Sequence, residues 1–110
     1  MRVAANRDEF RARPADPADW WPEGLLAGRD REAGGTWLGV TRTGRFAALT
    51  NYRDPRARRT GLRSRGALPI AFLLDTAAPR TFLEGLRQSR ADYEGFNLLV
   101  GTPDELWWYG

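Results

Sequence analysis

A period of two on either side of a Thr43-Gly44 turn constrains this 110-residue chain more than any other feature. Small or apolar residues occupy alternate positions in residues 37–41 and again in residues 46–50. Such alternation is typical of strands with one buried face, and Gly44 supplies the positive φ that a tight hairpin turn needs. The chain must therefore contain an antiparallel β-hairpin.

Two helices and a second hairpin are expected after this one. The first helix begins after Ser64 and buries Leu68, Phe72 and Leu73, although Pro69 is comfortable only in a helix's first turn. The second begins at Pro79 and continues at helical spacing through Tyr93 to a stop at Gly95. Strands over 96–101 and 105–109 follow. The sequence thus predicts an α+β fold, with antiparallel β-hairpins and two helices packed on the sheet.

The segment from Arg11 to Gly34 is predicted to be irregular. It contains three prolines and three glycines around the adjacent Trp20 and Trp21. Irregular stretches of this length are uncommon in compact domains, and two tryptophans argue against disorder. We therefore expect a long loop anchored by its tryptophan pair.

Composition excludes several classes of chemistry. The chain has no Cys and no His, which rules out a disulfide framework, the usual zinc sites and the Ser–His–Asp and Cys–His catalytic arrangements. No apolar run approaches the roughly 20 residues that span a bilayer, and the first residues lack the apolar core of a secretory signal. We expect a cytoplasmic protein without a membrane span, a metal site or a cofactor.

The densest polar cluster is Asn6-Arg7-Asp8-Glu9, directly after an apolar start at Val3. On a strand, Asn6 and Asp8 would share one face while Arg7 and Glu9 share the other. One pair could then face a cleft while the other forms a structural ion pair. The alternative is a solvated strand end.

Two further segments contribute candidates. Gly34-Gly35 before Trp37 could present backbone N–H groups to an anion, or could let two backbone segments pass closely. Asn51 could hold an oxyanion or read an amide where the second hairpin strand ends, or could cap the following turn. The candidate pocket comprises Asn6, Asp8, Asn51, Thr50, Gly35 and Trp37.

Residues 53–65 contain six Arg against one Asp, within a formal net charge of +3. Such a cluster could hold the phosphates of RNA or of another anionic ligand, with Arg53, Arg63 and Arg65 as the anion-binding candidates. All 17 basic residues are Arg, which a GC-rich genome would also produce. The only aromatic residue is Tyr52 at the edge of the cluster, which argues against nucleic acid as a partner. The alternative to an anion-binding site is an exposed loop.

Several segments, taken in order, closely resemble the NRDE family, also called the transport and Golgi organisation protein 2 family. The matching stretches are 3–10 with its Asn-Arg-Asp-Glu motif, 13–14, 26–30, 34–41, 44–53, 64–66 and 95–101. They cover nearly the whole chain. A four-residue motif alone would be weak, but a collinear series of this length is specific.

The resemblance implies a partial fold of the N-terminal-nucleophile hydrolase type, an αββα sandwich, over a single partial domain at 1–110. Family members typically begin Met-Cys on a strand that precedes the Val3 strand, and the Cys stands at the nucleophile position. Here Arg2 follows Met1, so the chain resembles an internal fragment that lacks the Met-Cys strand, with its catalytic residue, and the family's C-terminal half. By analogy with choloylglycine-type amidases, Asp8 would orient the nucleophile's amine and Asn51 would contact the reacting carbonyl.

The resemblance favours a family protein of uncharacterised activity that handles a small ligand, such as haem or a lipid metabolite. A longer parent would be a candidate amide hydrolase. The alternative function is a basic module that binds anionic ligands or RNA through Arg53–Arg65. We also expect self-association through exposed sheet edges, at the Val3 strand and at the strand that carries Trp107 and Trp108.

Overall fold

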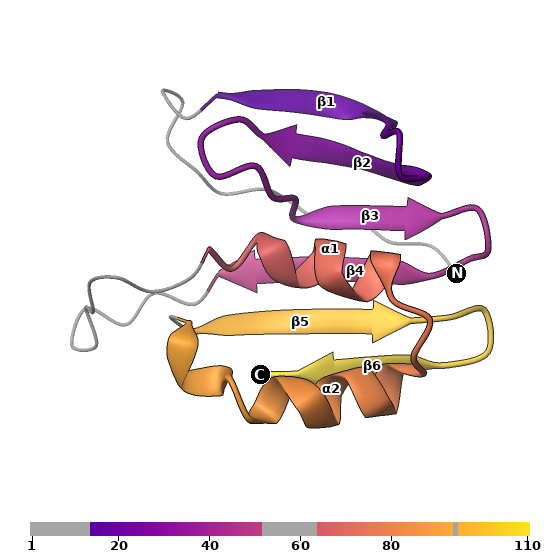
Figure 1. Cartoon of the computed structure of the whole chain (residues 1–110), viewed down its shortest axis with the longest axis vertical. Coiled ribbons are helices and arrows are strands. Elements are labelled where there is room, and N and C mark those ends of the chain that lie inside the picture. The colour runs from indigo at the N-terminus through magenta and orange to yellow at the C-terminus, as the bar shows by residue number, and fades with distance from the viewer. Residues whose placement is uncertain (1–13, 52–63, 94) are drawn as a thin grey trace.

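The strands form an open antiparallel sheet whose spatial order follows the chain (Figure 1). The computed structural model describes residues 14–51, 64–93 and 95–110. Within them the sheet has six strands, in the order β1-β2-β3-β4-β5-β6. The strands are β1 (Ala15–Trp20), β2 (Leu25–Asp30), β3 (Leu38–Thr41), β4 (Phe46–Asn51), β5 (Phe96–Gly101) and β6 (Leu106–Tyr109).

The segment predicted to be an irregular loop is instead a hairpin of β1 and β2, so that prediction is wrong. The register of β1 shifts between Asp16 and Asp19, where Pro17 lies. Proline is tolerated at sheet edges and bulges because no ladder hydrogen bond is lost there, and β1 is an edge strand of the sheet that the described residues form. Gly24, with φ of 90°, closes the turn. The prolines therefore mark an irregular edge strand rather than the absence of a strand.

Both predicted hairpins, the one around Gly44 and the one after the helices, are confirmed. β3 pairs with β4 across a turn in which Gly44 has φ of 91°. β4 pairs with β5 along its whole length, from Phe46 opposite Gly101 to Asn51 opposite Phe96. β6 folds back on β5, which completes the sheet.

Both predicted helices are present. α1 (Ala67–Leu74) places Pro69 in its first turn, where proline costs little, and buries the three side chains expected of it, Leu68, Phe72 and Leu73. α2 (Pro79–Arg87) begins at its proline as predicted. It ends at Arg87, however, well before Gly95. The N–H groups of Gln88 and Ser89 donate to the carbonyls three residues back, those of Gly85 and Leu86, and a short 3₁₀ helix, Arg90–Asp92, follows.

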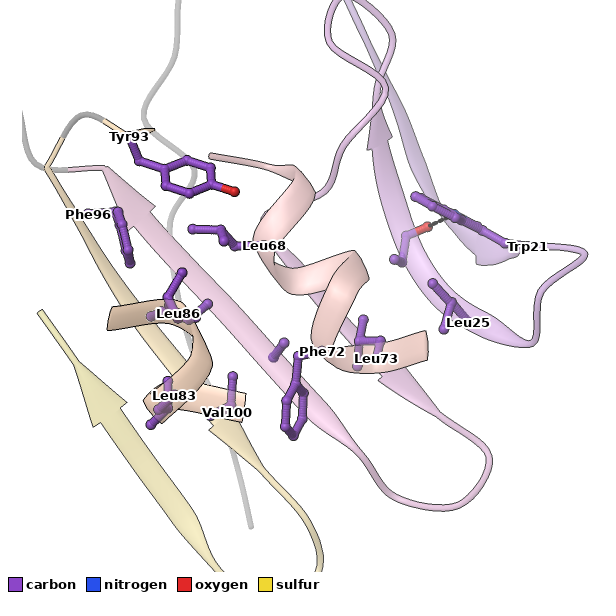
Figure 2. Close-up of a cluster of buried hydrophobic side chains, with 13 residues drawn as sticks. Trp21, Leu25, Leu68, Phe72, Leu73, Leu83, Leu86, Tyr93, Phe96 and Val100 are labelled. Atoms are coloured by element: carbon purple, nitrogen blue, oxygen red, sulfur yellow. Dashed lines mark hydrogen bonds between the residues drawn. The ribbon is translucent and has the colours of Figure 1, made fainter. Parts of the chain in front are cut away.

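The two helices cover one face of the sheet and form the core with it (Figure 2). Phe72 from α1 and Phe82 from α2 meet edge to face, with ring centroids 5.2 Å apart. Leu98 and Val100 of β5 are fully buried beneath them. Successive side chains of a strand point to opposite faces of the sheet, so every second residue of β3, β4 and β5 lies on the helix-free face. There Leu38, Ala48 and Leu99 are half-buried.

The fold is therefore α+β, with an antiparallel sheet and a helix layer on one side of it. A sheet with helices on one face is one half of an αββα sandwich. The second β-layer of such a sandwich would lie on the helix-free face. This arrangement is consistent with the partial sandwich that the family resemblance implies.

Candidate functional site

One end of the sheet gathers the candidate residues that the structure describes. β4 ends there at Asn51, β5 begins there at Phe96, and the two residues pair. The segment that leads into β3 and the start of α1 lie at the same end, because the Thr36 N–H donates to the Gly66 carbonyl at 3.1 Å. Four parts of the chain thus meet at this end of the sheet. The sequence predicted such a meeting only for the two strands of the hairpin, β3 and β4.

Gly35 lies against the backbone of Gly66, and this contact explains the glycine pair. A Cβ at Gly35 would come within 2.5 Å of the Gly66 carbonyl carbon. The neighbouring N–H groups are already engaged, since Gly34 donates to Asp30 O and Thr36 to Gly66 O. Of the two interpretations of this segment, the structure bears out the close backbone passage. A part for Gly35 in a ligand pocket stays a prediction.

Trp37 is half-buried, with its indole packed over Gly28 in β2. A Cβ at Gly28 would lie 2.6 Å from Trp37 Cη2, so any larger residue there would displace the ring. The adjacent Thr36 is 2% exposed, and its hydroxyl donates to Leu38 O at 3.2 Å. These two contacts hold the segment before β3 in place. Trp37 thereby brings an aromatic side chain to the end of the sheet where β3 begins.

Arg65 connects the start of α1 to the start of β5. Its Nη1 donates to the Gly95 carbonyl at 2.9 Å, immediately before Phe96. This bond places a positive charge at the end of the sheet where β4 stops. It gives Arg65 a structural contact that the sequence did not predict, and its part in anion binding stays a prediction.

Thr50 is exposed near the end of β4 and pairs with Asn97 of β5. Asn97 in turn accepts a hydrogen bond from Trp108 Nε1, with 3.3 Å between Nε1 and Oδ1. These three polar groups follow one another across β4, β5 and β6. Sequence reasoning missed Asn97, although one amide within the otherwise apolar run of residues 96–101 was a visible signal.

The other candidates lie outside the described residues, and their placement stays a prediction. They are Asn6, Arg7, Asp8, Glu9, Arg53 and Arg63. For Asn51 the structure gives the strand position only, opposite Phe96. In the described parts of the chain, no group of three His, Cys, Asp or Glu residues could hold a metal ion.

At the opposite end of α1, Arg45 holds the helix to the β3–β4 turn. Its Nε and Nη2 donate to Phe72 O at 3.0 and 2.8 Å, and Nη1 donates to Ala77 O at 2.8 Å. The guanidinium also lies 3.9 Å from the centre of the Phe72 ring. Desolvation lowers the pKa of Arg45 from its ordinary value, while the Asp75 carboxylate acts to raise it. Because an arginine guanidinium is not deprotonated in proteins, Arg45 remains charged and acts as a structural clamp.

No helix in the described residues has both the length and the apolar character needed to cross a membrane. The longer of the two α-helices, α2, has nine residues and an exposed Arg80–Glu84 ion pair on its surface.

Comparison with known proteins gives one consistent result. Residues 2–110 match the family model described as Transport and Golgi organisation 2. The chain is 44% identical over 103 residues to the Transport and Golgi organization protein 2 homolog of Bos taurus. It is 41% identical to the corresponding homologs of Mus musculus and Homo sapiens. Each of these alignments covers 89% of this chain but 37% of the relative, so the chain spans a little over a third of their length.

Proposed function

The chain belongs to the Transport and Golgi organisation 2 family, and we propose that it binds a small amphipathic anion at the end of the sheet where β4 stops. One observation carries this proposal. The structure brings a positive charge at Arg65, an exposed hydroxyl at Thr50 and an aromatic ring at Trp37 to one end of one sheet. Such a set suits a ligand with an anionic group on an apolar body.

The apolar part of the ligand would lie on the helix-free face. Beside Thr50, this face carries the half-buried side chains of Leu38, Ala48 and Leu99. Ligand sites in proteins are mostly apolar, with a few polar groups that fix orientation. Haem, with its flat ring and two carboxylates, and acyl-lipid metabolites with a carboxylate or phosphate both have this chemistry.

The anionic part would be held by Arg65, with Asn6 from the motif that precedes the described residues as a further donor. A guanidinium presents planar donors that match carboxylate and phosphate oxygens. Asp8 repels an anion, so in this proposal it accepts from a donor of the ligand or fixes a neighbouring group. In this proposal Arg7 and Glu9 would pair with each other and not with the ligand.

The proposal contains no catalytic step within this chain. With neither Cys nor His among its 110 residues, the chain lacks the side chains that usually act as an activated nucleophile and its base. A longer relative with a Cys nucleophile would use the same end of the sheet to place an amide carbonyl near Asn51.

The test is a titration of the purified chain with haemin, followed by absorbance, and with palmitoyl-coenzyme A, followed by tryptophan fluorescence. Arg65→Gln should weaken binding of the better ligand by about tenfold, the usual effect of losing a charged hydrogen bond. Thr50→Ala should weaken it by a smaller factor. Arg80→Gln removes an equal charge from the exposed surface of α2 and should change nothing.

Three results would overturn the proposal: no saturable binding of either ligand, an equal loss in Arg65→Gln and Arg80→Gln, or binding that is unaffected by both site variants. A thermal melt of each variant shows whether it is folded at the titration temperature, which separates lost binding from lost folding. If an oligouridylate binds tightly and depends on Arg65 while neither small ligand binds, the chain is instead a basic module for anionic polymers.

A further inference from the structure

Asn97 is an amide side chain inside a strand whose neighbouring positions are apolar. It lies in β5, an inner strand that pairs with β4 on one side and with β6 on the other. Phe96 and Leu98 on either side of it are buried in the core, so Asn97 lies half-buried on the helix-free face. Asparagine is disfavoured in strands. A residue that contradicts the local preference in this way is expected at functional sites.

Trp108 fixes which way the Asn97 amide faces. The indole Nε1 can donate but cannot accept, so it meets the oxygen of the amide, with 3.3 Å between Nε1 and Oδ1. Trp108 lies in β6, opposite Leu99 of β5. The Nδ2 group is the other branch of the amide and therefore faces away from β6, on the side of β4. It forms no hydrogen bond with the described part of the chain, and its two N–H donors are available.

Thr50 places a second neutral donor beside this amide. It lies on β4 directly opposite Asn97, and directly opposed side chains share a face with Cβ atoms about 4.5–5.5 Å apart. Within residues 14–51, 64–93 and 95–110, no side-chain hydrogen bond engages the Thr50 hydroxyl. The next pair on the same face is Ala48 with Leu99, which is apolar. Neutral donors at the border of an apolar surface match an oxygen acceptor on an apolar ligand.

We propose that Asn97 and Thr50 bind a neutral acyl carbonyl oxygen of the ligand, and that Trp108 is the positioning residue that orients the amide. This inference rests on the function proposed above and names the chemical class of its ligand, an anion joined to its apolar chain through an ester or amide carbonyl. Of the two ligand classes considered there, acyl lipids have such a carbonyl, whereas the oxygens of haem belong to carboxylates.

The spacing along β5 sets how far the carbonyl lies from the anionic group. Arg65 donates to the carbonyl of Gly95, two residues before Asn97. Two residues of a strand span about 7 Å. The ligand therefore has its carbonyl a few bonds from its charge, as the ester carbonyl of a lysophosphatidate lies a few bonds from the phosphate.

A matched pair of lipids tests for the carbonyl. 1-Palmitoyl lysophosphatidate and 1-O-hexadecyl lysophosphatidate have the same phosphate and the same chain length, and they differ only in the ester carbonyl. Both are titrated into the purified 110-residue chain below their micellar concentrations, with calorimetric detection. The ester should bind about fivefold to tenfold more tightly than the ether, since one or two neutral hydrogen bonds are worth about this factor.

Asn97→Asp separates recognition of the ligand from a structural role. The aspartate still accepts from Trp108 Nε1 but has no N–H donor, so the preference for the ester should disappear while the Tm stays close to that of the wild type. The charge that it adds acts on the phosphate of both lipids, so the ratio of the two Kd values reports the carbonyl contact. Thr50→Val should reduce this ratio in part. Arg65→Gln should weaken both lipids and leave the ratio unchanged.

Trp108→Phe tests the positioning role, because it removes the N–H that orients the amide. It should lower the preference for the ester at least about twofold in the wild type and should have no further effect in a chain that carries Asn97→Ala. An equal loss in both backgrounds would show that Trp108 does not act through Asn97. Trp20→Phe makes the same change at an exposed tryptophan of β1 and should leave the preference unchanged.

The outcomes distinguish this inference from the function on which it rests. Equal affinity for the two lipids, or a preference that survives in Asn97→Asp, would refute the carbonyl contact, while the anion site stands if Arg65→Gln weakens both lipids. A preference that depends on Asn97 but binding that is indifferent to Arg65→Gln would refute the anion site and support the carbonyl contact. If neither lipid binds, both are wrong.

Discussion

The contact between Gly35 and Gly66 predicts that one added methyl group destabilises the chain. A Cβ at Gly35 would lie 2.5 Å from the Gly66 carbonyl carbon, 2.7 Å from its oxygen and 2.8 Å from its Cα. All three atoms are backbone, so no side chain can rotate away and α1 must shift from the entry to β3. Overpacking of this kind costs about 1–3 kcal/mol of unfolding free energy.

The same substitution elsewhere should have the opposite sign. Gly85 is exposed inside α2, and nothing lies within 4 Å of the position its Cβ would take. Alanine in a helix interior is favoured over glycine by roughly 0.5–1 kcal/mol. Gly85→Ala is thus a matched control, because the covalent change and its effect on the unfolded chain are equal in the two variants.

Thermal melts at low micromolar concentration measure both effects. With an unfolding entropy of about 2.1 cal/mol/K per residue, 1 kcal/mol corresponds to roughly 4 °C in a chain of this size. Gly35→Ala should lower the Tm by about 4–12 °C, and Gly85→Ala should raise it by about 2–4 °C. If Gly35→Ala melts at or above the wild type, the close passage does not hold α1 in place and the geometric argument fails.

Three further predictions concern a clamp, the polar motif and catalysis. Arg45→Met should lower the unfolding free energy by about 1–3 kcal/mol in urea titrations, because the Phe72 and Ala77 carbonyls lose their donors; an unchanged midpoint would contradict this. Asp8→Asn should abolish haemin or palmitoyl-coenzyme A binding while changing stability by no more than about 1 kcal/mol. A much lower Tm with binding retained would instead make the motif a structural clasp. A β-lactone probe should label no residue in mass spectra, and any mapped adduct would overturn the expectation that this chain is not catalytic.

The elements predicted correctly are those that a short stretch of sequence specifies by itself. Alternation around Gly44 predicted β3 and β4, and helical spacing with Pro79 at the first position predicted α2. The end of α2 was misplaced because Gly95 is a plausible stop in sequence, whereas the helix ends through hydrogen bonds of residues 88 and 89. Terminal geometry of this kind is set by packing and leaves little trace in residue types.

β1 was missed because its residues contradict the average preferences of a strand. It contains two Asp and one Pro in six residues, and its side chains are mostly exposed. A strand at an edge is stabilised by its one neighbour, here through pairing with β2. Strand propensity reports how well a residue fits a half-buried pleated surface, and an edge strand with a bulge does not present one. Of the tryptophan pair predicted to anchor this segment, Trp21 is buried and its Nε1 donates to Ala27 O at 3.0 Å, whereas Trp20 is 44% exposed.

The segments that carry the family resemblance meet at the start of α1, and much of their sequence is explained by packing there. The stretch at 34–41 contributes Gly35 and the stretch at 64–66 contributes Gly66, which touch backbone to backbone. Arg65 of the second stretch bonds to Gly95, the first residue of the stretch at 95–101. These contacts account for the two glycines, and Arg65 combines its bond to Gly95 with the proposed anion site. The other residues proposed for ligand binding are Trp37, Asn97, the exposed Thr50 and, ahead of the described residues, Asn6 and Asp8 of the Asn-Arg-Asp-Glu motif. A chain with Asp8→Asn that folds normally and binds nothing would assign the chemistry to that motif and the glycines to the scaffold.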